Sequence, residues 1–249
     1  MPRTARKKSK TGIYHVMIRG NNQQQIFEEE EDYKKLLYIL QDCKEISKFK
    51  LHAYCLMGNH VHLLIEECEE PISTIMKRIN CRFVAWYNRK YERSGHLLQD
   101  RFHSEVIENQ RAFLAVIRYI HKNPVKAGLA NKISAYRWSS YHAYSGKKSN
   151  LVDTDNLYSI FKNRKEILDF FQLPSDDICL DVKPYALIND IRGRDIIYRI
   201  TNCRNVSEFQ SLGKKLRDRF LIELKKCGLS IRQISRLCGI SRRTISLAV

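Results

Sequence analysis

The amino-acid sequence predicts an α+β fold: a ferredoxin-like four-stranded antiparallel sheet with helices, followed by an all-α C-terminal helix-turn-helix region. The first observation behind this prediction is the run of apolar patterns between residues 13 and 107, which switch between a period of two and a period of about 3.6 residues. The second is the C-terminal segment, where helical periodicity coincides with a high density of lysine and arginine. The chain therefore combines a sheet-forming half with a helical, strongly basic end.

Turn signals and apolar spacing define the elements of the sheet-forming half. Gly20-Asn21-Asn22 closes the first strand, and Gly58-Asn59 is a two-residue hairpin turn. The predicted strands are residues 13–19, 51–57, 60–66 and 102–107, and the predicted helices are residues 30–47, a long helix that Pro71 opens, and residues 110–123. We expect the last helix to end at Pro124, because the residue before a proline avoids the α conformation. The first six elements follow the split βαβ order.

Composition indicates a polyanionic partner. Lysine and arginine outnumber acidic residues 44 to 27, which gives a net charge of +17. Nucleic acid is the expected partner, because neutralised phosphates release counterions. The eight cysteines form no CxxC pair, so a zinc knuckle or a redox dithiol of that kind is excluded. An apolar N-terminal segment and a run approaching 18 apolar residues are both missing, so we expect a cytoplasmic protein with no membrane partner.

The triplet His60-Val61-His62 is the strongest candidate for a metal site. Residues two apart on a strand point to the same face, so both imidazoles project side by side. Two imidazoles at this spacing can close on one metal ion. The alternative without a metal site is that the two histidines form only the polar face of a half-exposed strand.

A tyrosine and an asparagine share one face of the helix that follows the fourth strand. Tyr119 and Asn123 are four residues apart and are therefore neighbours on the helix surface. His121 lies about 200° around the helix from Tyr119, so it does not share that face. Asn123 is consequently the better third metal ligand, through its amide oxygen, and we expect His121 at the surface or in the core. The alternative for any of the 13 tyrosines is packing.

Several spaced motifs together resemble a known family. The segments that carry the resemblance are His60-Val61-His62 after Met57-Gly58-Asn59, Gln99-x-Arg101-Phe102, Tyr119-x-x-x-Asn123-Pro124-Val125-x-Ala127-Gly128, Ile18-Arg19-Gly20-Asn21-Asn22 and Trp138-Ser139-Ser140-Tyr141. They are similar to motifs of the single-tyrosine transposases and, more narrowly, of the REP-associated tyrosine transposases. The resemblance covers roughly residues 12–145.

The resemblance implies an activity and a set of roles. His60 and His62 would bind Mg²⁺ or Mn²⁺, with Asn123 in a third-ligand position that some relatives fill with glutamine. Tyr119 would attack a phosphate of single-stranded DNA and form a 5′-phosphotyrosine, so that strands are cut and rejoined. Hairpin-forming repeats are an expected form of that DNA. The sequence contains no clear general base, and proton loss to a metal-bound water or directly to solvent both stay open. Candidates for DNA contacts are Arg19, Asn21, Arg78, Arg82 and Arg101.

The C-terminal segment predicts a helix-turn-helix that binds duplex DNA. Residues 211–249 contain ten basic and two acidic side chains. Ser230 and Gln233 form a capping box, and Gly239 supplies a tight turn. The candidate DNA contacts at the start of the second helix are Ser241, Arg242, Arg243 and Thr244. The alternative is a generic helical hairpin.

Three parts of the chain follow from these patterns: a catalytic domain at residues 1–130, a helical connector at 131–204 and the helix-turn-helix region at 205–249. Two other functions stay open. The first is a DNA-binding regulator whose transposase-derived domain is not catalytic. The second, an RNA-binding module on the same sheet, would need paired aromatics on central strands, for which His52 and Tyr54 are a poor substitute. The oligomeric state stays open between a monomer and a homodimer.

Overall fold

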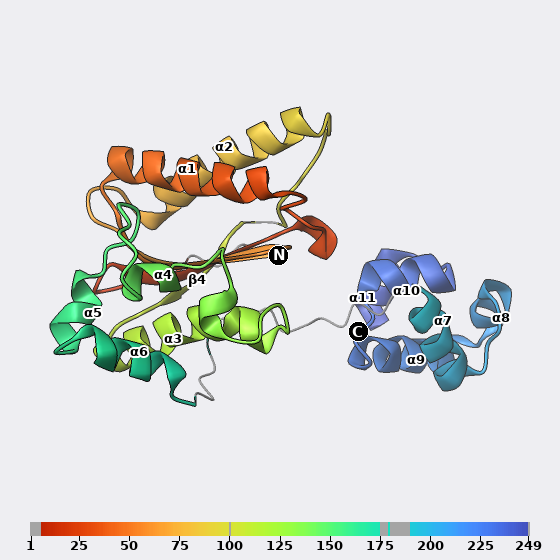
Figure 1. Cartoon of the computed structure of the whole chain (residues 1–249). Helices are drawn as coiled ribbons and strands as arrows, with labels where there is room; N and C mark the ends of the chain where they lie inside the picture. Colours follow the sequence, from red (N-terminus) through yellow and green to blue (C-terminus); the bar gives the residue numbers. More distant parts are fainter. Residues whose placement is uncertain (1–5, 100, 175–178, 180–189, 249) are drawn as a thin grey trace. The chain divides into compact units, whose positions relative to one another are not determined.

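A computed structural model describes residues 6–99, 101–174, 179 and 190–248 of the chain (Figure 1). The chain divides into two compact units, Met1–Leu180 and Asp181–Val249. The first unit contains the sheet, and the described part of the second is helical.

The sheet has four antiparallel strands in the order β2-β3-β1-β4. Its strands are β1 (Ile13–Arg19), β2 (Lys50–Met57), β3 (His60–Glu66) and β4 (His103–Val106). This order is the one that a βαββαβ chain gives in the ferredoxin-like layout, so the predicted sheet is confirmed.

Helices cover both faces of the sheet. The helices α1 (Glu30–Ser47) and α2 (Ile72–Lys90) lie together on one face, and α3 (Gln110–Lys126) lies on the other (Figure 1). Strand alternation supplies each face with its own core: Val61, Leu63 and Ile65 of β3 join the cluster under α1 and α2, whereas Leu64 joins the cluster under α3. The even-numbered residues of β3 therefore face α3.

The helix α3 continues past Pro124 and ends at Lys126, so the predicted end at residue 123 is wrong. A proline inside a helix removes one backbone donor and disfavours the α conformation of its predecessor. Here Asn123 and Pro124 are both buried, and the Asn123 carbonyl accepts from Ala127 N at 2.9 Å. Tertiary packing thus keeps the last turn helical, and Asn123 lies inside the helix one turn after Tyr119.

Residues 133–172 complete the first unit and cover the free edge of β2. Cys55 pairs with Ser139, Leu56 N donates to Trp138 O at 2.9 Å, and Ser140 N donates to Tyr54 O at 3.0 Å. The short elements of this segment pack into the cluster under α3; they are η2 (Ile133–Ala135), α4 (Tyr141–Tyr144), α5 (Asp155–Ile160) and α6 (Arg164–Gln172). One further turn, η1 (Asn21–Gln23), follows β1.

The second unit has its own apolar cluster. Its elements are α7 (Asp190–Thr201), α8 (Val206–Ser211), α9 (Lys214–Lys226), α10 (Ile231–Cys238) and α11 (Arg242–Ala248). Ile197 of α7 is buried with Phe209, Leu224 and Ile234. The predicted connector, residues 131–204, is therefore divided: its first part packs in the sheet unit and α7 packs in the helical unit. Residues 175–178 and 180–189 of that connector lie outside the described residues.

Candidate active site

His60 and His62 project from β3 toward α3, as the strand period predicts. Their ring centroids lie 5.0 Å apart, and the rings are nearly perpendicular at 86°. His62 is fully buried, whereas His60 is half-buried. The Asn59 side chain of the hairpin turn contacts His60, with Oδ1 2.7 Å from Nδ1. If Nδ1 carries the proton and donates to this oxygen, Nε2 of His60 is the nitrogen without a proton.

Tyr119 lies beside this pair of histidines. Its ring centroid is 5.7 Å from that of His62, in an edge-to-face arrangement, and the residue is only 4% exposed. The Lys126 ammonium lies 5.6 Å from the Tyr119 ring centroid. Asn123 is 6% exposed on the same face of α3, because residues four apart on a helix are neighbours. The fold thus brings Tyr119 to the histidines, as predicted from the motifs.

A third histidine, His15 of β1, belongs to the same cluster and was not predicted from the sequence. Its Nε2 is 3.0 Å from Nδ1 of His62, and both residues are fully buried. The two rings are stacked with centroids 5.2 Å apart, and His15 also contacts the edge of Tyr119. The only sequence signal was a histidine within a strand, 47 positions from its partner.

The electrostatic environment keeps His62 neutral. Burial lowers its pKa well below that of free histidine, and the neighbouring His15 and His60 lower it further. A neutral imidazole is the form that binds a metal ion. Its buried Nε2 has no hydrogen-bond partner within the described parts of the chain. This nitrogen is therefore a donor atom available to an ion.

The donor set fits Mg²⁺ or Mn²⁺ when the amide of Asn123 is included. Among the described residues, no group of three or more histidine, cysteine, aspartate or glutamate side chains is arranged to hold a metal ion. An asparagine amide oxygen is a suitable ligand for these ions. The buried Nδ2 of Asn123 makes no hydrogen bond within the described residues, so protein contacts do not fix the amide in one orientation. Two imidazoles and one amide oxygen are thus the candidate ligands.

His121 lies away from the site, in the core. Its Nε2 is 2.7 Å from the Ser140 hydroxyl oxygen, and its ring packs against Tyr141, Tyr144 and Phe171. Burial lowers its pKa to about 3. The expectation that His121 does not share the face of Tyr119 is confirmed.

Arg19, Asn21 and Arg101 are differently placed with respect to the histidines. Arg19 is directly opposite His60 in the β1–β3 register, so it ends its strand beside the site. Asn21 follows in η1, where its backbone N–H donates to Leu97 O at 2.8 Å. Arg101 is exposed just before β4. Of the three, only Arg19 is brought next to a site histidine by strand pairing.

Arg78 and Arg82 are not brought to the histidines. Both belong to α2, on the opposite face of the sheet from His60 and His62 (Figure 1). Arg78 makes an ion pair with Glu70, and Arg82 makes one with Asp42. Their charges are already matched on that face.

The C-terminal residues singled out from the sequence begin α11. Ser241 Oγ accepts from Thr244 N at 3.1 Å, which caps the helix, and Arg242 and Arg243 are exposed in its first turn. Gly239, at φ +67, ends α10 in the left-handed conformation expected of a turn glycine. The Ser230 side chain caps α10 by accepting from the backbone N–H of Gln233 at 3.2 Å.

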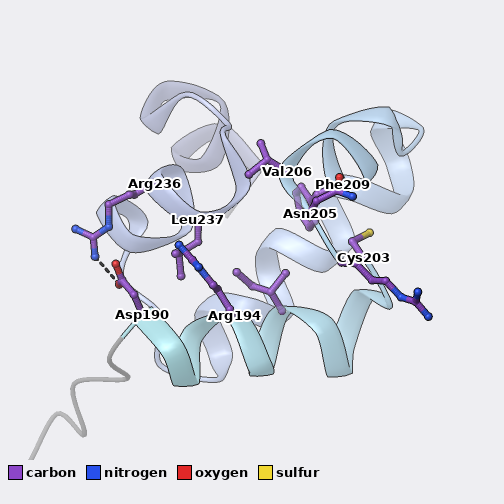
Figure 2. A pocket seen from close by; sticks show the side chains of 10 residues that line it. Asp190, Arg194, Cys203, Asn205, Val206, Phe209, Arg236 and Leu237 are labelled. Carbon is purple, nitrogen blue, oxygen red and sulfur yellow. Dashed lines mark hydrogen bonds and ion pairs between the residues drawn. The ribbon is translucent and has the colours of Figure 1, made fainter.

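A cavity of about 360 Å³ opens in the helical unit between α7, α8 and α10 (Figure 2). Arg194, Arg204 and Arg236 line it together with apolar side chains, and Arg236 is paired with Asp190. Arg194 and Arg204 thus add to the ten basic residues of 211–249, which already include Arg236.

Across the residues that the structure describes, no helix combines the length and the apolar character needed to cross a membrane.

Comparison with known proteins finds transposases in each case. Residues 8–123 match the model of the IS200-like transposases. The REP-associated tyrosine transposase of Escherichia coli (strain K12) is 23% identical over 137 residues, which span 54% of this chain and 78% of that protein. A putative REP-associated tyrosine transposase of Haemophilus influenzae is 28% identical over 106 residues, which span 38% of this chain and 60% of that protein.

A solved structure shares the fold. It is a REP-associated tyrosine transposase bound to a REP hairpin, and it matches 61% of this chain and 94% of its own with a TM-score of 0.51 at 20% identity. That likeness supports the fold alone. Taken with the match over residues 8–123, it confirms the resemblance read from the motifs: this part of the chain is similar to the IS200-like transposases and to the REP-associated tyrosine transposases.

Proposed function

We propose that the chain is a metal-dependent single-stranded DNA endonuclease and strand transferase that acts through a 5′-phosphotyrosine. The observation that supports this proposal best is the packing of Tyr119 against His62, on the face that also presents His60. The family adds that its members are transposases. The similar solved structure holds a REP hairpin, so we extend the proposed substrate to single-stranded DNA that folds into hairpins.

The residues of the site have distinct tasks in this mechanism. His60, His62 and Asn123 would hold Mg²⁺ or Mn²⁺, which when bound polarises the scissile phosphate as a Lewis acid. The Tyr119 hydroxyl attacks the phosphorus: the new bond joins the phenolic oxygen to phosphorus, and the bond from phosphorus to the 3′ oxygen breaks. The phenol loses its proton as it attacks, and the departing 3′ oxygen takes up a proton, so that a free 3′-hydroxyl results. Rejoining reverses these steps, and because one phosphodiester replaces another, no ATP is needed.

Burial of Tyr119 suits this role. A phenol with a pKa near 10 is a poor nucleophile at neutral pH, so positioning must supply part of the acceleration. The edge-to-face contacts with His15 and His62 hold the ring from one side, and α3 holds its backbone. We propose that Arg19, Asn21 and Arg101 contact the DNA, whereas Arg78 and Arg82, which are paired on the other face, are not carried into the proposal.

The test of the nucleophile is Tyr119→Phe, with Tyr141→Phe as the matched control. We expect the Tyr119 variant to lose cleavage and the covalent DNA adduct while keeping its fold and DNA binding, because only the hydroxyl is removed. Labelled single-stranded hairpin DNA, Mg²⁺ and peptide mapping of the adduct provide the measurement. An adduct on the Tyr119→Phe protein, or one mapped to Tyr141, would refute the assignment. A protein that binds this DNA but never forms an adduct would be the non-catalytic regulator instead.

We further propose that the helical unit binds duplex DNA as a helix-turn-helix. Its support is the capped start of α11 with exposed Arg242 and Arg243, and the ten basic against two acidic residues between 211 and 249. Phosphate contacts would supply most of the affinity, so binding should weaken steeply with salt.

A further inference from the structure

His15 occupies a special position in the register of the sheet. In the β1–β3 ladder His15 is opposite Leu64 and Met17 is opposite His62, so His15 meets His62 diagonally. The diagonal contact is a hydrogen bond between Nε2 of His15 and Nδ1 of His62, 3.0 Å long and fully buried. The contact uses the nitrogen of His62 that a metal ion bound at Nε2 would leave free.

In a hydrogen bond between two neutral imidazoles, the shared proton can belong to either ring, so there are two arrangements of donor and acceptor. If His15 donates, Nδ1 of His62 accepts and the proton of His62 is on Nε2. That N–H would be buried without an acceptor among the described residues, which is unfavourable. If His62 donates through Nδ1, its Nε2 carries only an electron pair. This second arrangement puts the other proton on Nδ1 of His15, so the surroundings of that nitrogen decide between the two. It is also the tautomer of His62 that binds a metal.

A carboxylate on the next strand supports the same arrangement. Glu105 of β4 is directly opposite His15, and its Oε2 lies 3.8 Å from Nδ1 of His15. A carboxylate at this position favours a proton on Nδ1 of His15. The Nε2 of His15 is then an acceptor for His62. Glu105, His15 and His62 thus form a chain across β4, β1 and β3, three neighbouring strands in the sheet order.

We propose that His15 is a positioning residue for the metal site: backed by Glu105, it accepts a hydrogen bond from Nδ1 of His62 and so fixes the His62 ring with a bare Nε2 directed at the ion. The inference rests on the proposed function in one respect, the assignment of His62 as a ligand. Partners of this kind hold ligating histidines in many metal sites, and their loss costs about 10–100-fold in metal affinity.

The first test reads the tautomer of His62 in the metal-free protein. Nitrogen-15 NMR of the imidazoles distinguishes a protonated from an unprotonated ring nitrogen. We expect His62 to be protonated at Nδ1 and bare at Nε2 in the wild type, and to lose this fixed tautomer in His15→Leu. A wild-type His62 protonated at Nε2 would overturn the proposal, whether or not the protein cleaves DNA.

The second test is the affinity for Mn²⁺, measured by titration calorimetry on the full chain without DNA. His15→Leu should bind Mn²⁺ about 10–100-fold more weakly, whereas His15→Gln, whose amide oxygen can accept from His62, should recover most of the affinity. His52→Gln is the matched control, because His52 is also buried and also contacts a carboxylate, Glu66, at 2.9 Å. Wild-type affinity in folded His15→Leu would overturn the proposal, and so would equal losses in His15→Leu and His15→Gln.

These outcomes separate the inference from the proposed function. If Tyr119 forms no adduct but His62 shows the bare Nε2 and His15→Leu loses Mn²⁺, the function fails and the positioning role stands. Should His15→Leu not fold, as judged by its thermal unfolding, the wild-type tautomer and the His15→Gln affinity still decide the question.

Discussion

His62 combines full burial with a nitrogen, Nε2, that has no hydrogen-bond partner among the residues that the structure describes. An unpaired buried polar atom normally costs free energy, so a fold that keeps one at a functional site has a use for it. The nearby His60 is half-buried and has its Nδ1 held by Asn59. The two imidazoles and the Asn123 amide are therefore unequal as candidate ligands, and we expect their variants to differ in severity.

His60→Ala and His62→Ala should each reduce metal-dependent cleavage to below about a hundredth of wild type, since losing a ligand should cost at least as much as losing its supporting contact. Asn123→Ala should reduce it less, because water can replace one amide oxygen. Cleavage rates across a Mn²⁺ series measure the effect, with His52→Gln as control. Full wild-type activity in excess chelator would contradict the metal assignment.

His121 makes stability depend on pH. Its folded pKa of about 3 is below the value near 6.5 of an unfolded histidine, so the unfolded chain binds the proton first as pH falls. The stabilisation by neutral His121 is complete above pH 6.5 and is lost progressively between pH 6.5 and 3, by about 2 kcal/mol on reaching pH 5. His121→Gln should unfold more easily at pH 7 but should lose less stability toward pH 5. Equal slopes for the two proteins in denaturant titrations at several pH values would contradict this.

At this scale the sequence was most informative where residues act within one element. His60 and His62 follow from the strand period, and Tyr119 and Asn123 follow from the helix period together with the family motifs. His15 could not be found in this way, because its role depends on how β1 pairs with β3. The prediction that Arg78 and Arg82 contact DNA did not consider the sheet face on which α2 packs, and it stays a prediction.

Among the elements, β1 is followed directly by a glycine, Gly20, that allows two backbone segments to approach. A Cβ on Gly20 would overlap the Gln24 carbonyl oxygen and press on Ile26, although the glycine itself has an ordinary φ of −65°. Gly20 N also donates to Asn59 O at 2.8 Å, next to His60. The Gly58-Asn59 turn, which positions His60, is therefore stabilised by a hydrogen bond from the residue that follows β1.

Gly20→Ala should lower the free energy of unfolding by about 1–3 kcal/mol through this overlap and should weaken Mn²⁺ binding, because Asn59 is displaced. Gly128→Ala is the control: its φ of +71° costs about 1–2 kcal/mol, but a Cβ there meets nothing within 4 Å, so Mn²⁺ affinity should be unchanged. The fluorescence of Trp86 and Trp138, both in the sheet unit, follows unfolding. Unaltered Mn²⁺ affinity in Gly20→Ala would refute the link to the site.

Element existence was predictable and some element ends were not. Period and turn residues gave all four strands and the helices α1, α2 and α3. The end of α3 was misplaced because the local rule for a residue before proline yields here to the burial of Asn123 and Pro124. A local preference of this size is easily overcome by packing that only the folded chain contains.

For the whole molecule, the packing of α7 determines where the chain can be truncated without exposing a buried apolar surface. Residues 205–249 were predicted as a separate region, yet Ile197 of α7 is buried in the same cluster as Phe209 and Ile234. Composition could not reveal this, since α7 looks like any amphipathic helix until its partners are known. A deletion at 205 would leave its apolar face uncovered, whereas residues 1–180 form one compact unit.

A protein of residues 1–180 should keep single-strand cleavage, because Tyr119, His60 and His62 all belong to that unit. It should bind duplex DNA more weakly and with a flatter salt dependence, since the basic residues of 211–249 are removed. Duplex affinity at several salt concentrations, measured beside hairpin cleavage, checks both. Unchanged duplex binding would make the helical unit a protein-contact or structural hairpin, and lost cleavage of short single strands would place it in the active domain.

The pairing of residues 138–140 with β2 also limits how copies of the chain can associate. An open strand at the rim of a sheet is a template for strand addition, the step that begins both sheet-extended dimers and aggregates. At β2 the Leu56 N–H and the Tyr54 carbonyl are already taken by the chain itself. The opposite rim is β4, only four residues long, with exposed His103 and Glu105. A self-association that extends this sheet through residues 54–56 would first have to displace the chain's own segment, residues 138–140. This requirement opposes polymerisation along the β2 edge even when the protein is concentrated.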